Sequence, residues 1–174
     1  MESIKNIWAD ENLIKVLKGG SVVVMPTDTL YGLVGQALSQ ETVARILKIK
    51  KRSPHKFCIN LIGSLNELTK FSITLSTEQK KVLENFTEPT TFVLDSISFR
   101  LPQSNELRNL LLQTGPLIAP SANPEGLTPA KNIEEAKNYF GDSVDLYIDG
   151  GEVKGKASRV IKLSKDSSVA IIRE

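Results

Sequence analysis

The stretch Val22-Val23-Val24-Met25-Pro26-Thr27-Asp28-Thr29-Leu30-Tyr31-Gly32-Leu33 is an apolar run that ends at a proline and passes into small hydroxyl-bearing residues. Its valines and methionine predict a buried strand, and the proline predicts that the strand ends there. The hydroxyls and backbone amides that follow would then face a cleft, which is where open α/β sheets bind ligands. An ordinary turn, in which Asp28 and the threonines satisfy only backbone groups, explains the same residues.

A second stretch has the same design. The apolar run Leu117-Ile118-Ala119-Pro120 also ends at a proline, and Ser121-Ala122-Asn123 follows it. Two strand ends of this kind would offer short hydrogen-bonding side chains to one crevice. A turn stabilised by Ser121 and Asn123 is again the alternative without a ligand.

Two features between these stretches involve cations. A helix predicted after Ser39 ends in the basic sequence Lys48-Ile49-Lys50-Lys51-Arg52. Cations at a helix C-terminus complement the helix dipole, which gives them an ordinary explanation. Arg100 interrupts an apolar strand, where an arginine is costly unless it meets an anion. It therefore indicates either an exposed edge position or a clamp for a carboxylate.

Length and composition favour one soluble domain. The chain has 174 residues, of which 40% are hydrophobic, so we expect a single domain over residues 1–174. The 22 Lys and Arg residues nearly balance the 20 Asp and Glu residues, and the net charge does not argue for nucleic acid. The only cysteine, Cys58, is expected in the core, and with one histidine, His55, it excludes an internal disulfide and a Cys/His zinc cluster. Neither a signal peptide nor a membrane-spanning run is evident, which predicts a cytoplasmic protein.

Strands and helices alternate along the chain. This order predicts an α/β fold, a single domain with a twisted mixed sheet flanked by helices. Helix starts are expected near Ser39, Ser76, Ser104 and Asn132, which are good N-cap residues. The expected helices cover residues 10–18, 39–52, 64–70, 76–86, 104–111 and 132–140. The expected strands cover residues 22–25, 57–62, 90–94, 117–120, 144–149, 158–163 and 169–173, and residues 150–158 are expected to form a lid-like loop.

Six segments in order resemble the YrdC/TsaC family of threonylcarbamoyl-adenylate synthases and together span nearly the whole chain. They are Pro26–Leu33, Lys50-Lys51-Arg52, Arg100-Leu101-Pro102, Ala119–Asn123, Asp149-Gly150-Gly151 with Ser158, and Ile172-Arg173. The chain departs from the family pattern at Glu88, where glycine is usual, and at Pro124-Glu125-Gly126, where Leu-Ser-Gly is more usual. The resemblance implies the YrdC-type α/β fold.

The resemblance also implies a reaction and its residues. The family forms threonylcarbamoyl-AMP and pyrophosphate from L-threonine, bicarbonate and ATP, a nucleotidyl transfer, and passes the product to a tRNA threonylcarbamoyl-transferase complex. The Lys-x-Arg signature places Lys50 and Arg52 in the cleft as catalytic residues. Threonine would be bound by Thr29, Tyr31, Arg100, Ser121 and Ser158. ATP would be bound by Lys50, Arg52, Lys56, Asn123, Lys131 and Arg173, with Mg²⁺ on the phosphates and no metal site in the protein.

The inventory of reactive groups suits this chemistry. The sequence offers no Ser-His-Asp set, cysteine nucleophile or metal cluster, whereas cations and hydroxyls are frequent near the strand ends. His55 lies in a polar loop and is kept out of the site. Two other functions stay open: a module that binds double-stranded RNA, and a carbamoyl-adenylate domain of hydrogenase maturation, which would use carbamoyl phosphate.

Overall fold

The computed structural model describes residues 6–54 and 56–174, so His55 lies outside the described residues. The strands are β1 (Val23–Pro26), β2 (Tyr31–Gln36), β3 (Ile59–Leu61), β4 (Thr90–Leu94), β5 (Ile97–Arg100), β6 (Leu117–Ile118), β7 (Leu146–Tyr147), β8 (Arg159–Leu163) and β9 (Val169–Arg173). The α-helices are α1 (Glu11–Lys18), α2 (Gln40–Lys50), α3 (Thr77–Glu84), α4 (Asn105–Thr114) and α5 (Ile133–Phe140). Short 3₁₀ turns cover Ile7–Ala9, Leu65–Phe71 and Gly141–Ser143.

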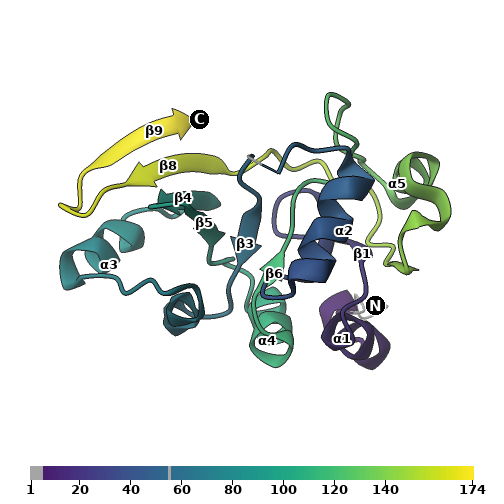
Figure 1. Cartoon of the computed structure of the whole chain (residues 1–174), viewed down its shortest axis with the longest axis horizontal. Helices are drawn as coiled ribbons and strands as arrows, with labels where there is room; N and C mark the ends of the chain where they lie inside the picture. The colour runs from purple at the N-terminus through teal and green to yellow at the C-terminus, as the bar shows by residue number, and fades with distance from the viewer. Residues whose placement is uncertain (1–5, 55) are drawn as a thin grey trace, which may run out of the picture.

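The strands of the described residues form one nine-stranded sheet in the order β7-β1-β2-β6-β3-β5-β4-β8-β9 (Figure 1). The pairs β1–β7, β3–β5 and β4–β8 are parallel, and the remaining pairs are antiparallel. The α/β class and the mixed sheet predicted from the sequence are therefore confirmed. The predicted N-caps are confirmed too, since Ser39, Ser76, Ser104 and Asn132 each accept a hydrogen bond from the first turn of a helix.

The first two strands form a hairpin, and its second arm was not predicted. The sequence indicated a strand that ends at Pro26, but the chain turns back as β2 and pairs antiparallel with β1. Gly32 and Gly35 weaken the strand pattern there. In the turn, the Thr27 hydroxyl donates to the Leu30 carbonyl at 2.7 Å and accepts from the Thr29 N–H at 3.2 Å. Thr27 thus satisfies backbone groups, as the turn interpretation proposed.

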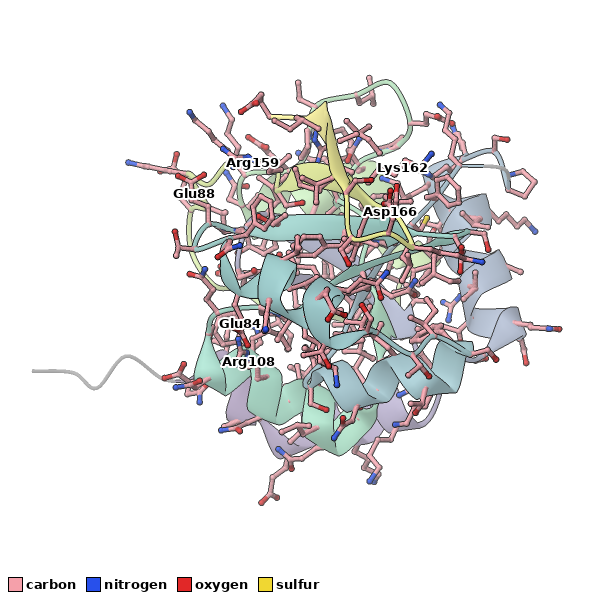
Figure 2. The ribbon with its side chains drawn as sticks, turned by 90° about the vertical axis from the view of Figure 1, so that its left-hand side faces the viewer. Glu84, Glu88, Arg108, Arg159, Lys162 and Asp166 are labelled. Carbon is pink, nitrogen blue, oxygen red and sulfur yellow. The ribbon has the colours of Figure 1, made fainter. Side chains whose placement is uncertain are left out.

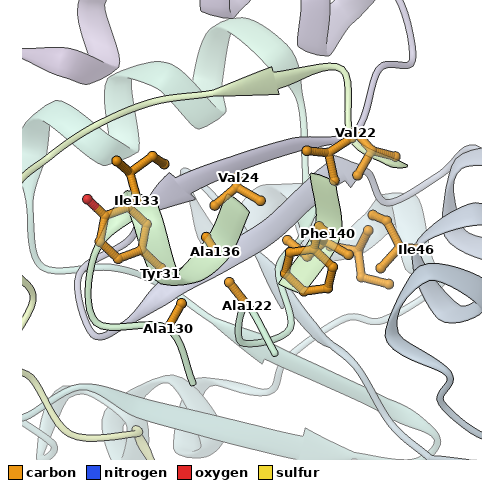
Figure 3. Close-up of a cluster of buried hydrophobic side chains, with 12 residues drawn as sticks. Val22, Val24, Tyr31, Ile46, Ala122, Ala130, Ile133, Ala136 and Phe140 are labelled. Atoms are coloured by element: carbon orange, nitrogen blue, oxygen red, sulfur yellow. The ribbon is translucent and has the colours of Figure 1, made fainter. Parts of the chain in front are cut away.

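Helices cover both faces of this hairpin. Alternate residues of the hairpin pack against α1 and α4 on one face, through side chains such as Leu13 and Leu110. The other alternates pack against α2 and α5, and Figure 3 shows this cluster, with Val24 and Tyr31 beside Ala136 and Ile46 beside Phe140. The period of two along a strand separates these two cores.

The strands β4, β5 and β8 divide their side chains differently. Phe92, Phe99 and Ile161 face a core with the Leu65–Phe71 turn and α3. The alternate positions face the other way and carry Thr91, Ser98, Arg100 and Val160, all of which line a cavity. This half of the sheet, at the left of Figure 1, is therefore covered by a helix on one face and forms the site on the other. No helix of the described residues is both long and apolar enough to cross a membrane.

Candidate active site

A cavity of about 430 Å³ lies where the β1–β2 turn meets the open face of β4, β5 and β8. The loop after β6 and the loop before β8 complete its wall. Its polar lining residues are Thr27, Thr29, Tyr31, Arg52, Cys58, Thr91, Ser98, Arg100, Ser121, Ser158 and Arg173. Apolar side chains such as Ile59, Val93 and Ile172 form the remainder. A volume of this size matches the clefts that bind small molecules.

The two proline-terminated stretches meet at this cavity, as predicted. The Leu33 N–H donates to the Pro120 carbonyl at 2.8 Å, and the Ala122 N–H donates to the Tyr31 carbonyl at 2.8 Å. Gly32 forms a bridge with Ser121. These backbone bonds fix Thr29 and Ser121 on neighbouring parts of the wall. The crevice that the sequence suggested is therefore present.

Arg100 is held by a carboxylate of the protein itself. Its Nη2 donates to Asp28 Oδ1 at 2.8 Å, and the two side chains are only 3% and 8% exposed. The same nitrogen donates to the Thr29 hydroxyl at 3.2 Å. Arg100 Nε and Asp28 Oδ2 are buried and have no hydrogen-bond partner in the structure. Of the two interpretations that the sequence left open, the exposed edge position is wrong, because Arg100 is buried, and the clamp for a ligand carboxylate stays a prediction, because the carboxylate that Arg100 meets is Asp28 of the protein.

Hydroxyl groups are paired along the cavity wall. Thr91 Oγ1 and Ser158 Oγ are 2.7 Å apart, and Thr27 Oγ1 and Thr29 Oγ1 are 3.3 Å apart. Each hydroxyl can donate one proton and accept others, so those of Thr29, Thr91 and Ser158 can turn toward a polar ligand, whereas the Thr27 proton is already donated to Leu30. Arg173 donates from Nη2 to the Ser158 carbonyl at 2.7 Å and also lines the cavity. Ser158 and Arg173 therefore lie where the resemblance placed them, at one site.

Tyr31 contributes its ring to the wall, while its hydroxyl holds a loop. The hydroxyl donates to the Gly151 carbonyl at 2.8 Å and accepts from the Gly150 N–H at 2.9 Å. Burial raises the pKa of Tyr31 above its usual value, so the phenol stays protonated. The resemblance implied that Tyr31 binds threonine, and a threonine ligand at this hydroxyl would have to replace these bonds.

The loop after β7 lies against the β1–β2 turn. A Cβ atom at Gly155 would overlap the carbonyl oxygen of Thr29, and one at Gly150 would overlap the ring of Pro26. The Val153 N–H donates to the Lys131 carbonyl at 2.7 Å, which fixes the middle of the loop. Residues 148–158 contain no strand among the described residues, and Ala157 and Ser158 line the cavity. That this loop acts as a lid stays a prediction.

Lys50 and Arg52 point to different places. Lys51 caps α2 in the left-handed conformation, with φ 53°, so the chain changes direction between the two cations. Arg52 lines the cavity and donates from Nη2 to the Phe57 carbonyl at 2.7 Å, while its buried Nε has no partner. Lys50 is 1% exposed and is absent from the cavity wall. The prediction that both side chains face the cleft is therefore correct for Arg52 and wrong for Lys50.

Lys50 instead lies beneath the second proline-terminated loop. Its Nζ donates to the carbonyls of Ser121 and Asn123, each at 2.6 Å. Burial, with the nearby charge of Arg52 as a smaller cause, lowers the pKa of Lys50 from 10.5 to about 8. The cost of an ammonium in this position is offset by the carbonyls, which are its partners in place of a carboxylate.

Of the other residues predicted to bind ATP, Arg173 lines the cavity, whereas Lys56, Asn123 and Lys131 do not. Asn123 is buried, and its amide accepts from the Ser121 hydroxyl at 2.6 Å and donates to the Leu127 carbonyl at 2.7 Å. Lys56 is exposed and forms an ion pair with Glu125. Lys131 is exposed, and its backbone N–H donates to the Glu135 carboxylate. None of these three side chains lines the cavity, although Asn123 contacts the cavity residue Ser121 from behind.

Cys58 lies at the edge of the core that the sequence predicted for it, where it packs against the cluster around Val24 and Tyr31. It is half-buried, and its side chain lines the cavity. Burial raises the pKa of the thiol above its usual value. The thiolate form needed for nucleophilic chemistry is disfavoured by that shift.

The charge of the wall suits an anion. Three guanidinium groups line it, from Arg52, Arg100 and Arg173, and none of its described residues carries a carboxylate. Asp28 offsets Arg100 from behind, so Arg52 and Arg173 carry the excess charge. In the described part of the chain, no three His, Cys, Asp or Glu residues are grouped as a metal site. Such a wall can position and neutralise anions, and it has no group suited to covalent catalysis.

Comparisons with known proteins agree with this geometry. A family model for Sua5, YciO and YrdC proteins, described as "Telomere recombination", matches residues 15–174. A protein of Methanocaldococcus jannaschii named "Putative threonylcarbamoyl-AMP synthase" is 30% identical in an alignment of 175 positions that spans 92% of this chain and 83% of that protein. A Hahella chejuensis protein named "Threonylcarbamoyl-AMP synthase" is 28% identical in an alignment of 161 positions that spans 82% of this chain and 86% of that protein.

A solved structure shares the fold. The crystal structure of P. abyssi Sua5 complexed with L-threonine superposes with a TM-score of 0.83 at 26% identity, over 98% of this chain. This chain spans 54% of the length of that Sua5 chain, so it corresponds to about half of it. The match of one family model to all but the first residues, together with the relative at 30% identity, shows that the chain belongs to the Sua5/YciO/YrdC family.

Proposed function

We propose that this chain is an L-threonylcarbamoyladenylate synthase, a nucleotidyltransferase that uses L-threonine, bicarbonate and ATP. The observation that carries the proposal is the cavity wall, where paired hydroxyls and three guanidinium groups converge without a carboxylate among its described residues. The names of the relatives support the same activity, and a structurally similar Sua5 binds L-threonine. The tRNA threonylcarbamoyl-transferase complex as the consumer of the product stays a prediction.

The proposed reaction needs positioning and charge neutralisation. The threonine amine attacks the carbon of bicarbonate, water leaves, and a carbamate forms. A carbamate oxygen then attacks the α-phosphorus of ATP, the bond to the bridging oxygen of the β-phosphate breaks, and pyrophosphate leaves. Arg52 and Arg173 would offset the charge of the carbamate and the phosphates, while the hydroxyls of Thr29, Ser121 and Ser158 would orient threonine.

ATP would enter as its magnesium complex. The described cavity wall offers hydroxyls and guanidinium groups, and Mg²⁺ prefers oxygen ligands of which the phosphates supply several. We infer that the ion would be held by phosphate oxygens and water, where it neutralises phosphate charge. Roles for Lys56, Asn123 and Lys131 in ATP binding stay predictions, because none of the three lines the cavity.

Pyrophosphate release tests the proposal. The wild type should release pyrophosphate only when threonine, bicarbonate and ATP are all present, and mass spectrometry should find threonylcarbamoyl-AMP. Arg52→Ala should lower the rate roughly a hundredfold, as expected for loss of a group that neutralises charge at the reacting centre. Arg45→Ala is the matched control, because Arg45 pairs with Asp145 and does not line the cavity. Release without threonine, or with carbamoyl phosphate in place of bicarbonate, would contradict the proposal and favour a maturation-type domain.

Binding of double-stranded RNA is not favoured by the charge distribution. On the face shown in Figure 2, acidic and basic side chains lie among one another, with Glu88 near Arg159 and Asp166 below Lys162. Arg159 contacts the carboxylates of Glu88 and Glu174, each at 3.6 Å. A surface that binds the phosphate backbone needs clustered, unpaired cations. RNA contact therefore stays a prediction without support from this face.

A further inference from the structure

The ammonium of Lys50 has no free donor for a ligand. An ammonium group carries three N–H bonds and no acceptor. Two of them meet the carbonyls of Ser121 and Asn123 at 2.6 Å, and Asn123 Oδ1 lies at 3.4 Å as the remaining acceptor. The side chain is 1% exposed, and it does not reach the cavity wall. To contact a phosphate, Lys50 would have to break both short bonds and leave its buried position.

The same lysine holds the loop through its backbone. The Lys50 carbonyl accepts from the Glu125 N–H at 2.8 Å, so the side chain and the main chain of one residue grip both ends of segment 121–125. Within this segment, the Ser121 hydroxyl donates to Asn123 Oδ1 at 2.6 Å, which closes the network on itself. Ser121 lines the cavity, whereas Lys50 and Asn123 lie behind it. The buried ammonium of Lys50 therefore holds the segment that contains the cavity residue Ser121.

We propose that Lys50 is a positioning residue, whose ammonium holds the Ser121–Asn123 loop in the shape that presents Ser121 to the ligand, while Arg52 alone of the Lys-x-Arg pair meets the ligand's anionic groups. The identity of the ligands in this inference rests on the proposed function. The positioning role of Lys50 rests only on its contacts with the loop. It differs from the role implied by the resemblance, in which both cations bind phosphate and carbamate.

Amide hydrogen exchange in the absence of ligands tests the loop directly. Lys50→Met removes the donors but keeps the apolar stem, and exchange in segment 121–127 should become roughly ten- to a hundredfold faster, the range expected for loss of a charge-assisted hydrogen bond. Lys48→Met is the matched control, because Lys48 is an exposed lysine of the same helix, and it should leave exchange unchanged. Lys50→Arg keeps charge and donors and should give intermediate exchange, which keeps the test usable if Lys50→Met does not fold. Exchange in this segment that equals that of the wild type in both Lys50 variants would overturn the inference.

Substrate dependence separates positioning from contact. If Lys50 positions Ser121, Lys50→Met should weaken threonine binding measured without ATP by at least tenfold, and should raise the KM for threonine together with that for ATP. A rise confined to the KM for ATP, with threonine binding unchanged, would show direct phosphate contact and overturn the inference. If the wild type releases no pyrophosphate yet Lys50→Met speeds exchange in the loop, the proposed function fails and the positioning role stands. If the wild type is active and the loop and threonine binding are unaffected, the inference fails and the function stands.

Discussion

The ion pair between Asp28 and Arg100 provides the sharpest test of how the site is held. Its side chains are 8% and 3% exposed, and its atoms are 2.8 Å apart. Removing one partner of a buried pair typically costs about 3–5 kcal/mol, because the other charge is left without compensation. Water in the adjoining cavity can partly solvate Arg100, so we expect the lower end, about 3 kcal/mol, for Asp28→Asn. The free energy of unfolding in urea measures this change.

A double-mutant cycle isolates the pair from other effects. Asp28→Asn and Arg100→Met, alone and together, give the coupling energy between the two side chains. The matched cycle uses Asp145→Asn and Arg45→Met, whose side chains are 39% exposed at 2.5 Å separation. Exposed pairs typically couple by about 0.2–1 kcal/mol, so burial should make the first coupling energy larger by about 2 kcal/mol even though Arg45 meets both oxygens of Asp145. Equal coupling energies in the two cycles would refute the reasoning that burial of Asp28 fixes Arg100.

Three further changes test other parts of the site. Tyr31→Phe removes the hydroxyl that bonds Gly150 and Gly151, and it should destabilise the protein by about 1–3 kcal/mol and speed amide exchange at Gly150; unchanged exchange would show that the hydroxyl does not hold the loop. Gly155→Ala should displace the loop from Thr29, so pyrophosphate release should fall at least tenfold with unchanged circular dichroism, and full activity would show that the loop need not lie there. The pKa of Lys50 falls to about 8 in the folded protein, so the unfolded chain binds this proton more tightly, and stability relative to Lys50→Met should rise by up to about 3 kcal/mol as the pH rises from about 8 to 10.5. Urea unfolding of both proteins at pH 7.5 and 9.5 should show about 2 kcal/mol of this rise, because the interval covers only part of it, and an unchanged difference in stability would contradict the prediction.

Patterns of apolar periodicity and capping predicted most of the fold. The helices begin at the expected caps because a serine or asparagine ahead of an apolar stripe can satisfy the first backbone N–H groups. The strand β2 was missed because its glycines lack side chains that mark a strand. Its other edge is paired with the loop after β6, a long-range contact that a local pattern does not contain.

The candidate site was predicted in part for a similar reason. Thr29, Arg52, Arg100, Ser121, Ser158 and Arg173 were expected together, and each lines the cavity. Asp28 was missed and Lys50 was misplaced, because a sequence shows which residues are polar and does not show which neighbours use their polar atoms. The direction of Arg52 relative to Lys50 depends on the left-handed Lys51, which ends the helix between them, a conformation that no residue type at that position requires.

Saturation of polar atoms then decides which motif residues can bind a ligand. At Tyr31, Lys50 and Asn123, protein groups already occupy the donors and acceptors, so a ligand must break hydrogen bonds that each contribute about 0.5–1.5 kcal/mol, or more where a charge takes part. Arg52 and Arg100 each keep a buried Nε without a partner beside the cavity, and such a group gains when a ligand supplies an acceptor. Ligand anions should therefore be drawn first to Arg52, because Asp28 already offsets the charge of Arg100, while the saturated residues hold the loops that surround them. Substitutions of the saturated residues should first disorder the loops and only then weaken ligand binding. Substitutions of Arg52 or Arg100 should weaken ligand binding while the loops stay ordered.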